Sequence, residues 1–192
     1  FDGFYAQDVA PPWVIGEPQP AVIALERDGW VSGAVLDAGC GTGENTILLT
    51  RLGYDVLGID FAPNAIAQAR EIAAARGVDA RFEVADAMNL AAQPGYDTVL
   101  DSALFHIFGD DADRARYVAS LHRATRSGGL LNLLALSDGG RGFGPMVTEA
   151  QVRGAFVDGW ELEALDITTY RGTGGPTGNP RLSECYGPSV PR

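Results

Sequence analysis

The 192-residue sequence predicts a single α/β domain, with a mainly parallel, twisted sheet and helices on both of its faces. Two observations support this prediction. Short apolar segments alternate along the chain with segments of helical pattern, and the apolar segments are hydrophobic almost throughout, as strands buried on both faces are. Right-handed crossovers would bring the carboxyl ends of the strands to one edge of the sheet, where such folds bind ligands.

The first half of the chain begins this alternation. Residues 34–37 predict a buried strand that leads into a helix over residues 44–52, and residues 54–60 predict the next strand. An Ala-rich helix then starts at Pro63, because proline suits the first turn of a helix, and stops at Gly77.

The second half continues the pattern. Residues 80–85 alternate apolar and polar side chains, as a strand does, and residues 98–102 predict a fourth strand. An amphipathic helix is predicted over residues 111–126. A pair of glycines closes it before the strongly apolar fifth strand, residues 130–136.

The remaining segments set the domain limits. A short helix is predicted over residues 149–156 and a strand over residues 160–170. We therefore expect the domain to cover residues 1–171, of which residues 1–32 form an irregular, Pro-rich N-terminal segment. Residues 172–192 are rich in Gly and Pro, and we expect an irregular C-terminal tail there.

Composition narrows the class of function. The chain has 25 acidic and 14 basic residues, a net charge of −11, which argues against a nucleic acid partner because phosphate binding needs a basic face. No apolar stretch approaches the roughly 18 residues of a membrane helix. The two cysteines and two histidines lack metal-ligand spacing. We expect no metal, no membrane contact and a reduced, cytoplasmic protein that is a monomer or weak homodimer.

A glycine-rich loop follows the first strand, where residues 36–45 read LDAGCGTGEN. A dinucleotide fingerprint would have its third glycine where Glu44 stands, and a carboxylate there would repel a pyrophosphate. S-adenosylmethionine carries no phosphate, and acidic neighbours suit its sulfonium cation. The three glycines would let the backbone approach such a cofactor closely.

Acidic residues end the following strands. Asp60 closes the second strand and could accept hydrogen bonds from both ribose hydroxyls. Asp86 ends the third strand and could accept from an adenine amino group, with the backbone of Ala87 at the ring edge. Asp101 and Ser102 end the fourth strand. Together these residues predict one adenosyl ligand across the carboxyl edge of the sheet.

These motifs resemble those of a known family. The segments LDAGCGTGEN, VLGIDFAP, FEVADAM and YDTVLDSALFHIF look like class I S-adenosylmethionine-dependent methyltransferases, over roughly residues 10–171. The resemblance implies a Rossmann-like domain that uses S-adenosyl-L-methionine and releases S-adenosyl-L-homocysteine. Its sheet should end in an antiparallel strand pair, and the tail offers only a very short second member, near residues 182–186.

A closer resemblance comes from PPWVIGEPQP, LTRLGYDVLGID, DSALFHIF and RARYVASLHR, which are similar to the heterocyclic toxin methyltransferases. By this resemblance, such enzymes methylate quinolone-type molecules such as 1-hydroxyquinolin-4(1H)-ones on oxygen, and some other heterocycles on nitrogen. The segment before the first strand would then fold over the cofactor as a lid, with Trp13 shielding the positive sulfur and Gln19 near the methionine end.

The predicted site has two parts. The expected cofactor residues are Trp13, Gly16, Gln19, Asp37, Gly39, Gly41, Gly43, Asp60, Phe61, Asp86, Ala87, Met88, Asp101 and Ser102. The expected acceptor pocket consists of Tyr5, Phe105, His106, Phe143 and Met146. His106 is the candidate catalytic residue, as a base or as a group that orients the substrate, whereas His122 is expected at the surface and Cys40 as a small filler.

The predicted function is methyl transfer from S-adenosylmethionine to the oxygen or nitrogen of a small aromatic heterocycle, foremost a 1-hydroxyquinolin-4(1H)-one type toxin, as detoxification. Several alternatives stay open. They are S-methylation of thiols or thiopurines, O-methylation of a phenolic natural product, an NAD-dependent oxidoreductase, and a cofactor-binding module without turnover.

Overall fold

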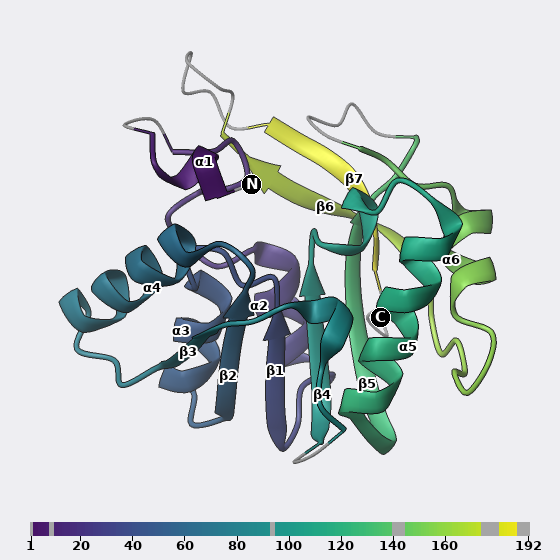
Figure 1. Cartoon of the computed structure of the whole chain (residues 1–192), viewed down its shortest axis with the longest axis horizontal. Coiled ribbons are helices and arrows are strands. Elements are labelled where there is room, and N and C mark those ends of the chain that lie inside the picture. Colours follow the sequence, from purple (N-terminus) through teal and green to yellow (C-terminus); the bar gives the residue numbers. More distant parts are fainter. Residues whose placement is uncertain (1, 8–9, 93–94, 140–144, 174–180, 188–192) are drawn as a thin grey trace.

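The computed structural model describes residues 2–7, 10–92, 95–139, 145–173 and 181–187. Its centre is a seven-stranded sheet in the order β3-β2-β1-β4-β5-β7-β6 (Figure 1). The strands are β1 (Ala34–Ala38), β2 (Asp55–Asp60), β3 (Arg81–Val84), β4 (Tyr96–Ser102), β5 (Thr125–Leu136), β6 (Asp166–Gly172) and β7 (Arg181–Gly187). The first five are parallel, and β7 is antiparallel to both of its neighbours, which confirms the predicted mainly parallel sheet.

Helices cover both faces of the sheet. They are α1 (Asp2–Tyr5), α2 (Pro20–Arg27), α3 (Glu44–Arg51), α4 (Pro63–Ala75), α5 (Asp111–Ala124) and α6 (Glu149–Ala155), with 3₁₀ turns η1 (Ala87–Asn89) and η2 (Phe105–Ile107). None of the helices in the described parts of the chain has the length and apolar character needed to cross a membrane.

Successive residues of the central strands feed two separate cores, because side chains alternate between the faces of a sheet. Val99 and Leu133 pack with α5 and α6. Leu100 and Leu134 pack on the other face with α2 and α3. All four are nearly or fully buried, so the near-continuous apolar pattern of these strands reflects burial on both sides.

Two predicted boundaries shift around β5. The helix expected to reach residue 126 ends at Ala124, and β5 starts at Thr125, five residues earlier than predicted. The glycine pair therefore lies inside the strand, where the pairing register with β4 shifts between Tyr96 and Thr98 and Gly128 has a φ of +76°. The two glycines were expected to end the helix, but they lie in β5 and allow its irregular first residues.

The C-terminal tail requires a correction. Residues 172–192 were expected to be irregular, yet β7 occupies Arg181–Gly187 and pairs along its whole length with β6. It also meets β5 through Ala135 and Leu136. This strand corresponds to the short final strand considered near residues 182–186. Its Gly- and Pro-rich flanks hide it in the sequence, because its hydrogen bonds come from long-range pairing.

The N-terminal strap, residues 2–7 and 10–19, lies above the carboxyl ends of the strands (Figure 1). Its first end is bound to α4, where the Asp2 carboxylate accepts from the backbone and side chain of Asn64. Its second end is bound just beyond β6, where Thr173 N–H donates to the Pro12 carbonyl at 2.7 Å. The strap therefore spans the edge of the sheet where ligands bind in such folds.

Candidate active site

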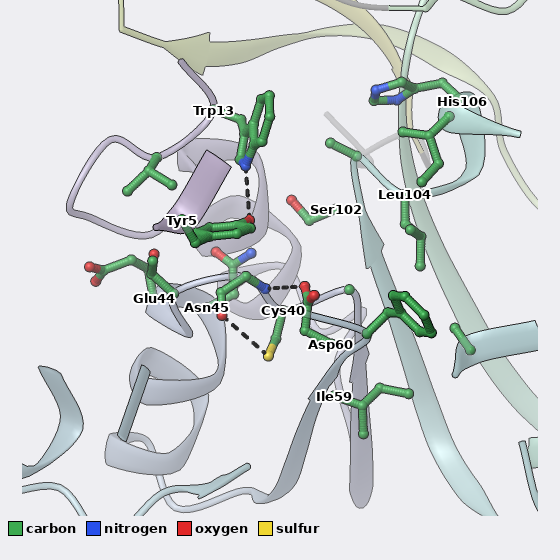
Figure 2. A pocket seen from close by; sticks show the side chains of 18 of the residues that line it. Tyr5, Trp13, Cys40, Glu44, Asn45, Ile59, Asp60, Ser102, Leu104 and His106 are labelled. Atoms are coloured by element: carbon green, nitrogen blue, oxygen red, sulfur yellow. Dashed lines mark hydrogen bonds between the residues drawn. The ribbon is translucent and has the colours of Figure 1, made fainter. Parts of the chain in front are cut away.

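A cavity of about 700 Å³ opens at the carboxyl edge of the sheet, beneath the strap (Figure 2). The glycine loop and the ends of β2, β3 and β4 bound one part, and η2, β5 and β6 bound the other. Ten predicted cofactor residues line it: Trp13, Gln19, Gly39, Gly41, Asp60, Phe61, Asp86, Ala87, Met88 and Ser102. From the predicted acceptor pocket, Tyr5 and His106 line it as well.

The glycine loop is fixed by the neighbouring strand end. The N–H groups of Gly39 and Cys40 both donate to the carbonyl of Ile59, at 2.9 and 2.8 Å. The N–H of Gly41 donates to Oδ2 of Asp60 at 2.9 Å. The loop thus turns sharply over the end of β2, which brings its backbone to the cavity wall.

Close contacts explain two of the glycines. Gly39 and Gly41 have φ angles of +74° and +53°, in the left-handed region that favours glycine. A Cβ atom on Gly39 would lie 3.0 Å from the Leu104 side chain, and one on Gly41 would lie 3.1 Å from the Tyr5 hydroxyl. The loop is therefore packed between the segment after β4 and the strap.

Asp60 lines the cavity with a carboxylate that is only partly occupied. Its Oδ1 accepts from Ala62 N–H at 2.8 Å and its Oδ2 from Gly41 N–H at 2.9 Å. A carboxylate has about four lone-pair positions, so two remain for a ligand. Burial raises the pKa of Asp60 from its ordinary value.

The carboxylate of Asp86 is partly occupied by its own loop. It accepts from Met88 N–H at 2.9 Å and from the Asn89 side chain, and it caps η1. Asp86 is exposed, whereas Ala87 behind it is buried. The turn therefore brings Asp86, Ala87 and Met88 to the cavity in a fixed arrangement.

Glu44 is not an isolated charge. It is the first residue of α3, it is buried, and it forms an ion pair with Arg76 at the end of α4. The same guanidinium also donates to the carbonyl of Gly16 at 3.3 Å. Arg76 thereby offsets the negative charge of Glu44, which was expected to repel a pyrophosphate. It also joins the strap to α3 and α4.

Four predicted cofactor residues do not line the cavity, namely Gly16, Asp37, Gly43 and Asp101. Gly43 is the N-cap of α3 with a φ of +81°, and a Cβ there would lie 2.6 Å from the ring of Phe82. Gly43 thus serves helix packing, and the carbonyl of Gly16 serves the Arg76 contact.

Two fully buried carboxylates, Asp37 and Asp101, lie beneath the cavity wall and not in its lining. Asp37 accepts from Thr46 Oγ1 at 2.6 Å, and burial raises its pKa to about 6. Asp101 accepts from Leu104 N–H at 2.8 Å and from Tyr117 O–H at 2.8 Å, and burial raises its pKa to about 7. Asp37 thus holds α3, and Asp101 holds the turn that leads into η2.

His106 points into the cavity from η2 (Figure 2). It is 5% exposed, and its Nδ1 accepts from Leu136 N–H at 3.3 Å. Burial lowers its pKa to about 4. Ala103, three residues earlier, has a φ of +76° and is the one non-glycine residue of the described chain with a positive φ, so the backbone that leads into η2 is strained.

Trp13 and Tyr5 meet on the strap. The indole Nε1–H of Trp13 donates to the Tyr5 hydroxyl at 2.9 Å (Figure 2). Burial raises the pKa of Tyr5 to about 12. Because Tyr5 lies against Gly41, it belongs to the glycine-loop side of the cavity and not to the acceptor side for which it was predicted.

Gln19 has a structural role that its sequence position did not reveal. Its Nε2 donates to the Arg171 carbonyl at 2.8 Å, and its Oε1 accepts from Arg171 N–H at 3.0 Å. Its own N–H donates to Asn45 Oδ1 at 3.1 Å. The amide of Gln19 therefore ties the strap to β6, while Gln19 also lines the cavity.

Two acceptor-pocket predictions differ from the structure, and a third falls outside the described residues. Phe105 is fully buried and packs against Phe156, with ring centroids 5.4 Å apart, so it belongs to the core. Met146 is 43% exposed and is not part of the wall, where Pro145 lies instead. Phe143 lies outside the described residues.

Other residues line the part of the cavity around His106. They are mainly apolar and come from the end of β4, η2, β5 and β6: Ser102, Leu104, Ile107, Phe108, Leu136 and Tyr170. The 3₁₀ turn explains part of this set, because it turns Phe105 toward the core while its neighbours face the cavity. No local sequence pattern predicts Tyr170 in the cavity, since its place depends on the pairing of β6.

Across the described ranges, no three His, Cys, Asp or Glu side chains gather as metal ligands.

Comparison with known proteins agrees with this geometry. A methyltransferase domain model matches residues 35–129. The chain is 42% identical over 120 residues to the 2-heptyl-1-hydroxyquinolin-4(1H)-one methyltransferase of Mycobacteroides abscessus; this match covers 62% of the chain and 52%, about half, of the relative. It is 35% identical over 105 residues to an uncharacterised methyltransferase of Schizosaccharomyces pombe, covering 54% of the chain and 72% of that protein.

A solved structure matches nearly the whole chain. It was reported for the conversion of a disulfide bond into a thioacetal group during echinomycin biosynthesis, and it has a TM-score of 0.91 and 38% identity. The match covers 98% of this chain and 90% of that one. The parallel sheet, the glycine loop over Asp60 and these relatives lead to one conclusion: the chain belongs to the class I S-adenosylmethionine-dependent methyltransferases.

Proposed function

We propose that this protein transfers the methyl group of S-adenosylmethionine to an oxygen or nitrogen atom of a small, flat aromatic heterocycle. A 1-hydroxyquinolin-4(1H)-one type toxin is the first substrate to test, and its methylation would be a detoxification. The observation that carries this proposal is a single cavity in which the glycine loop and Asp60 adjoin an apolar wall around His106. We expect a cytoplasmic enzyme that is a monomer or weak homodimer.

The cofactor side of the cavity fits S-adenosylmethionine in charge. The described lining includes the carboxylates of Asp60 and Asp86 but no Arg or Lys side chain. Such a wall gives a pyrophosphate no cationic partner, whereas it suits a sulfonium and an amino group. This argues against the NAD-dependent alternative, even though Arg76 offsets the charge of Glu44.

Named residues would hold the cofactor. Asp60 accepts the ribose hydroxyls, and Phe61, 75% exposed at the cavity, offers an apolar surface to the adenine. Asp86 and Met88 border the same ring. The backbone of the glycine loop and the Trp13 ring enclose the other end. When bound, S-adenosylmethionine supplies a methyl group on a positively charged sulfur, which leaves as the neutral thioether of S-adenosylhomocysteine.

The acceptor side positions the second substrate. Leu104, Ile107 and Phe108 give an apolar wall that favours a flat aromatic guest and excludes water. Holding the acceptor atom in line with the methyl group lowers the barrier to displacement, and the dry wall strengthens the polar contacts made there. His106 borders this guest as a base or as an orienting group.

Sulfur is the second candidate acceptor. The relative that matches nearly all of this chain was solved in work on the conversion of a disulfide bond into a thioacetal group, which is sulfur chemistry. A thiol or thiopurine would fit the same apolar wall. The nitrogen or oxygen acceptor remains first, because the relative named for a hydroxyquinolone has the higher identity, 42% over 120 residues.

The test is release of S-adenosylhomocysteine by the purified protein from labelled S-adenosylmethionine. The acceptors are a 2-alkyl-1-hydroxyquinolin-4(1H)-one, its N–H analogue, a thiopurine and a catechol, and mass spectrometry identifies the methylated atom. Turnover of the hydroxyquinolone supports the proposal, and turnover confined to the thiopurine moves the function to sulfur. Cofactor binding without product from any acceptor supports a binding module. The matched control is Asp60→Ala, which should bind cofactor weakly.

A further inference from the structure

His106 meets β5 at the point where β4 has ended. Ser102, the last residue of β4, is the register partner of Leu134, and Ala103 N–H still donates to the Leu134 carbonyl at 2.9 Å. Every second residue of a strand presents its N–H to the same neighbour. The N–H of Leu136 therefore points to where the next carbonyl of β4 would lie if that strand continued. Nδ1 of His106 takes the place of this carbonyl and accepts the hydrogen bond from Leu136 N–H, at 3.3 Å.

This contact fixes the proton of the imidazole. A neutral histidine has one nitrogen that accepts and one that donates. Because Nδ1 uses its lone pair on Leu136 N–H, Nε2 carries the hydrogen. The ring lines the cavity, so the hydrogen bond that it can still offer a ligand is one donated by Nε2–H. Burial, the one cause acting on His106, lowers its pKa to about 4, so the ring stays neutral at physiological pH.

We propose that His106 is a fixed hydrogen-bond donor to the acceptor substrate and not its base. The inference rests on the proposed methyltransferase function and specifies its substrate class. Acceptors must bring a free lone pair, as a heterocyclic nitrogen does, or lose their own proton to solvent, as an acidic N-hydroxy group or a thiol does. Unactivated alcohols and simple phenols would not be substrates.

The other candidate bases of the cavity are unsuitable. Burial raises the pKa of Tyr5 to about 12 and that of the Cys40 thiol well above its usual range, so neither is an anion near neutrality. The Asp60 carboxylate is bound by two backbone N–H groups at the end of β2, and its remaining lone pairs are those proposed to hold the ribose hydroxyls. The remaining carboxylates of the described wall are those of Asp2, Glu17, Glu44 and Asp86. Each of these four is already hydrogen-bonded within the protein: Asp2 to Asn64, Glu17 to Arg171, Glu44 to Arg76, and Asp86 to Met88 and Asn89.

For an N-hydroxy acceptor the step balances without a protein base. The O–H bond breaks first and its proton goes to water. One lone pair of the oxyanion accepts the Nε2–H of His106, which stabilises the ionised form. A second lone pair forms the new bond to the methyl carbon, and the electron pair of the broken carbon–sulfur bond remains on sulfur.

The first experiment reads the tautomer directly, without turnover. In ¹⁵N-labelled protein, long-range ¹H–¹⁵N correlation spectra distinguish protonated from unprotonated imidazole nitrogens. The chain has only two histidines, and a His122→Gln variant assigns the signals. We expect His106 protonated on Nε2 alone between pH 5.5 and 8. A proton on Nδ1, or titration of His106 within this range, would overturn the inference.

The second experiment compares His106→Gln, which keeps a donor but no basic nitrogen, with His106→Phe, which keeps ring size alone. The readout is the ionisation of a bound 1-hydroxyquinolone, followed by its absorbance in the presence of S-adenosylhomocysteine. We expect the native protein and the Gln variant to favour the bound anion, and the Phe variant to lose roughly tenfold in that preference, the scale of one hydrogen bond to a charged group. Equal loss in both variants would contradict the donor role.

Failure of this inference and failure of the proposed function give different results. A protein that methylates the panel while His106 titrates or carries its proton on Nδ1 contradicts the donor assignment alone. A protein with the expected tautomer that binds cofactor but neither binds nor methylates any acceptor contradicts the proposed function, and the donor role falls with it.

Discussion

The two sides of the cavity are built in different ways. The cofactor side is built around the glycine loop and the acids at strand ends, fixed by hydrogen bonds between residues close to that edge, such as Gly41 with Asp60. The acceptor side joins segments far apart in the sequence, from η2 to β5 and β6. The first design suits a ligand common to a whole family, and the second suits an acceptor that can change while the fold stays the same.

The largest effect should come from Asp101, which supports the acceptor side from below. Asp101→Ala would leave the buried donors of Leu104, Phe105 and Tyr117 unsatisfied. We expect a loss of about 3–5 kcal/mol in the free energy of unfolding, measured with urea. The matched variant Tyr117→Phe removes a single donor and should cost about 1 kcal/mol. Equal losses would show that Asp101 does not organise this turn.

The next effect concerns pH and His106. The pKa of His106 is 6.5 in the unfolded chain and about 4 in the folded protein. Between these two pH values the unfolded chain therefore binds one more proton than the folded protein. The native state therefore loses stability as the pH falls from about 6.5 to 4, by at most about 3 kcal/mol.

Asp37 and Asp101 act in the opposite sense. Burial raises their pKa values to about 6 and about 7, so their cost to stability grows as the pH rises from about 4 to 7. The His106 contribution is therefore the difference between the native protein and His106→Gln at each pH. A difference that does not change between pH 4 and 6.5 would contradict a buried, neutral His106.

On the cofactor side, Asp60→Ala should weaken S-adenosylmethionine binding by about 1–3 kcal/mol, the scale of a lost buried polar partner. Titration calorimetry measures this affinity. Asp86→Ala is the matched control, because Asp86 is exposed and bonded within its own turn, and we expect a smaller loss. Unchanged affinity in Asp60→Ala would remove Asp60 from the site.

The smallest effect should come from the ties of the strap. Gln19→Ala removes both side-chain bonds to the Arg171 backbone, at about 1 kcal/mol each. Hydrogen exchange should then increase in the strap more than in β1. Asp2→Ala loosens the exposed tie to Asn64, and its effect should be less than half as large. Equal exchange in both variants would mean that Gln19 is not the main tie.

The comparison also explains which features could be predicted from the sequence. The five parallel strands, the glycine loop and the acids at strand ends carry local patterns. The position of an acid relative to its strand end decides its role: Asp60 is the last residue of β2 and Asp86 lies beyond β3, and both reach the cavity. Asp37 and Asp101 each lie one residue inside their strands and are buried.

Other features depend on contacts that no local pattern reveals. The strand β7 is defined by pairing with β5 and β6. The role of Gln19 is set by Arg171, 152 residues further along the chain. The tautomer of His106 follows from the N–H of Leu136 on a neighbouring strand. Such contacts become visible only once distant segments are brought together.

The tie between Gln19 and Arg171 also orders the construction of the site in time. The glycine loop takes its hydrogen bonds from Ile59 and Asp60, which lie close by in the sequence, so these contacts become available early, while a ribosome is still making the chain. The strap gains its second anchor only after Arg171 and Thr173 have been added. In a nascent chain the local contacts of the glycine loop would therefore be available well before the strap can be fixed over the cavity, which happens only after synthesis has passed β6.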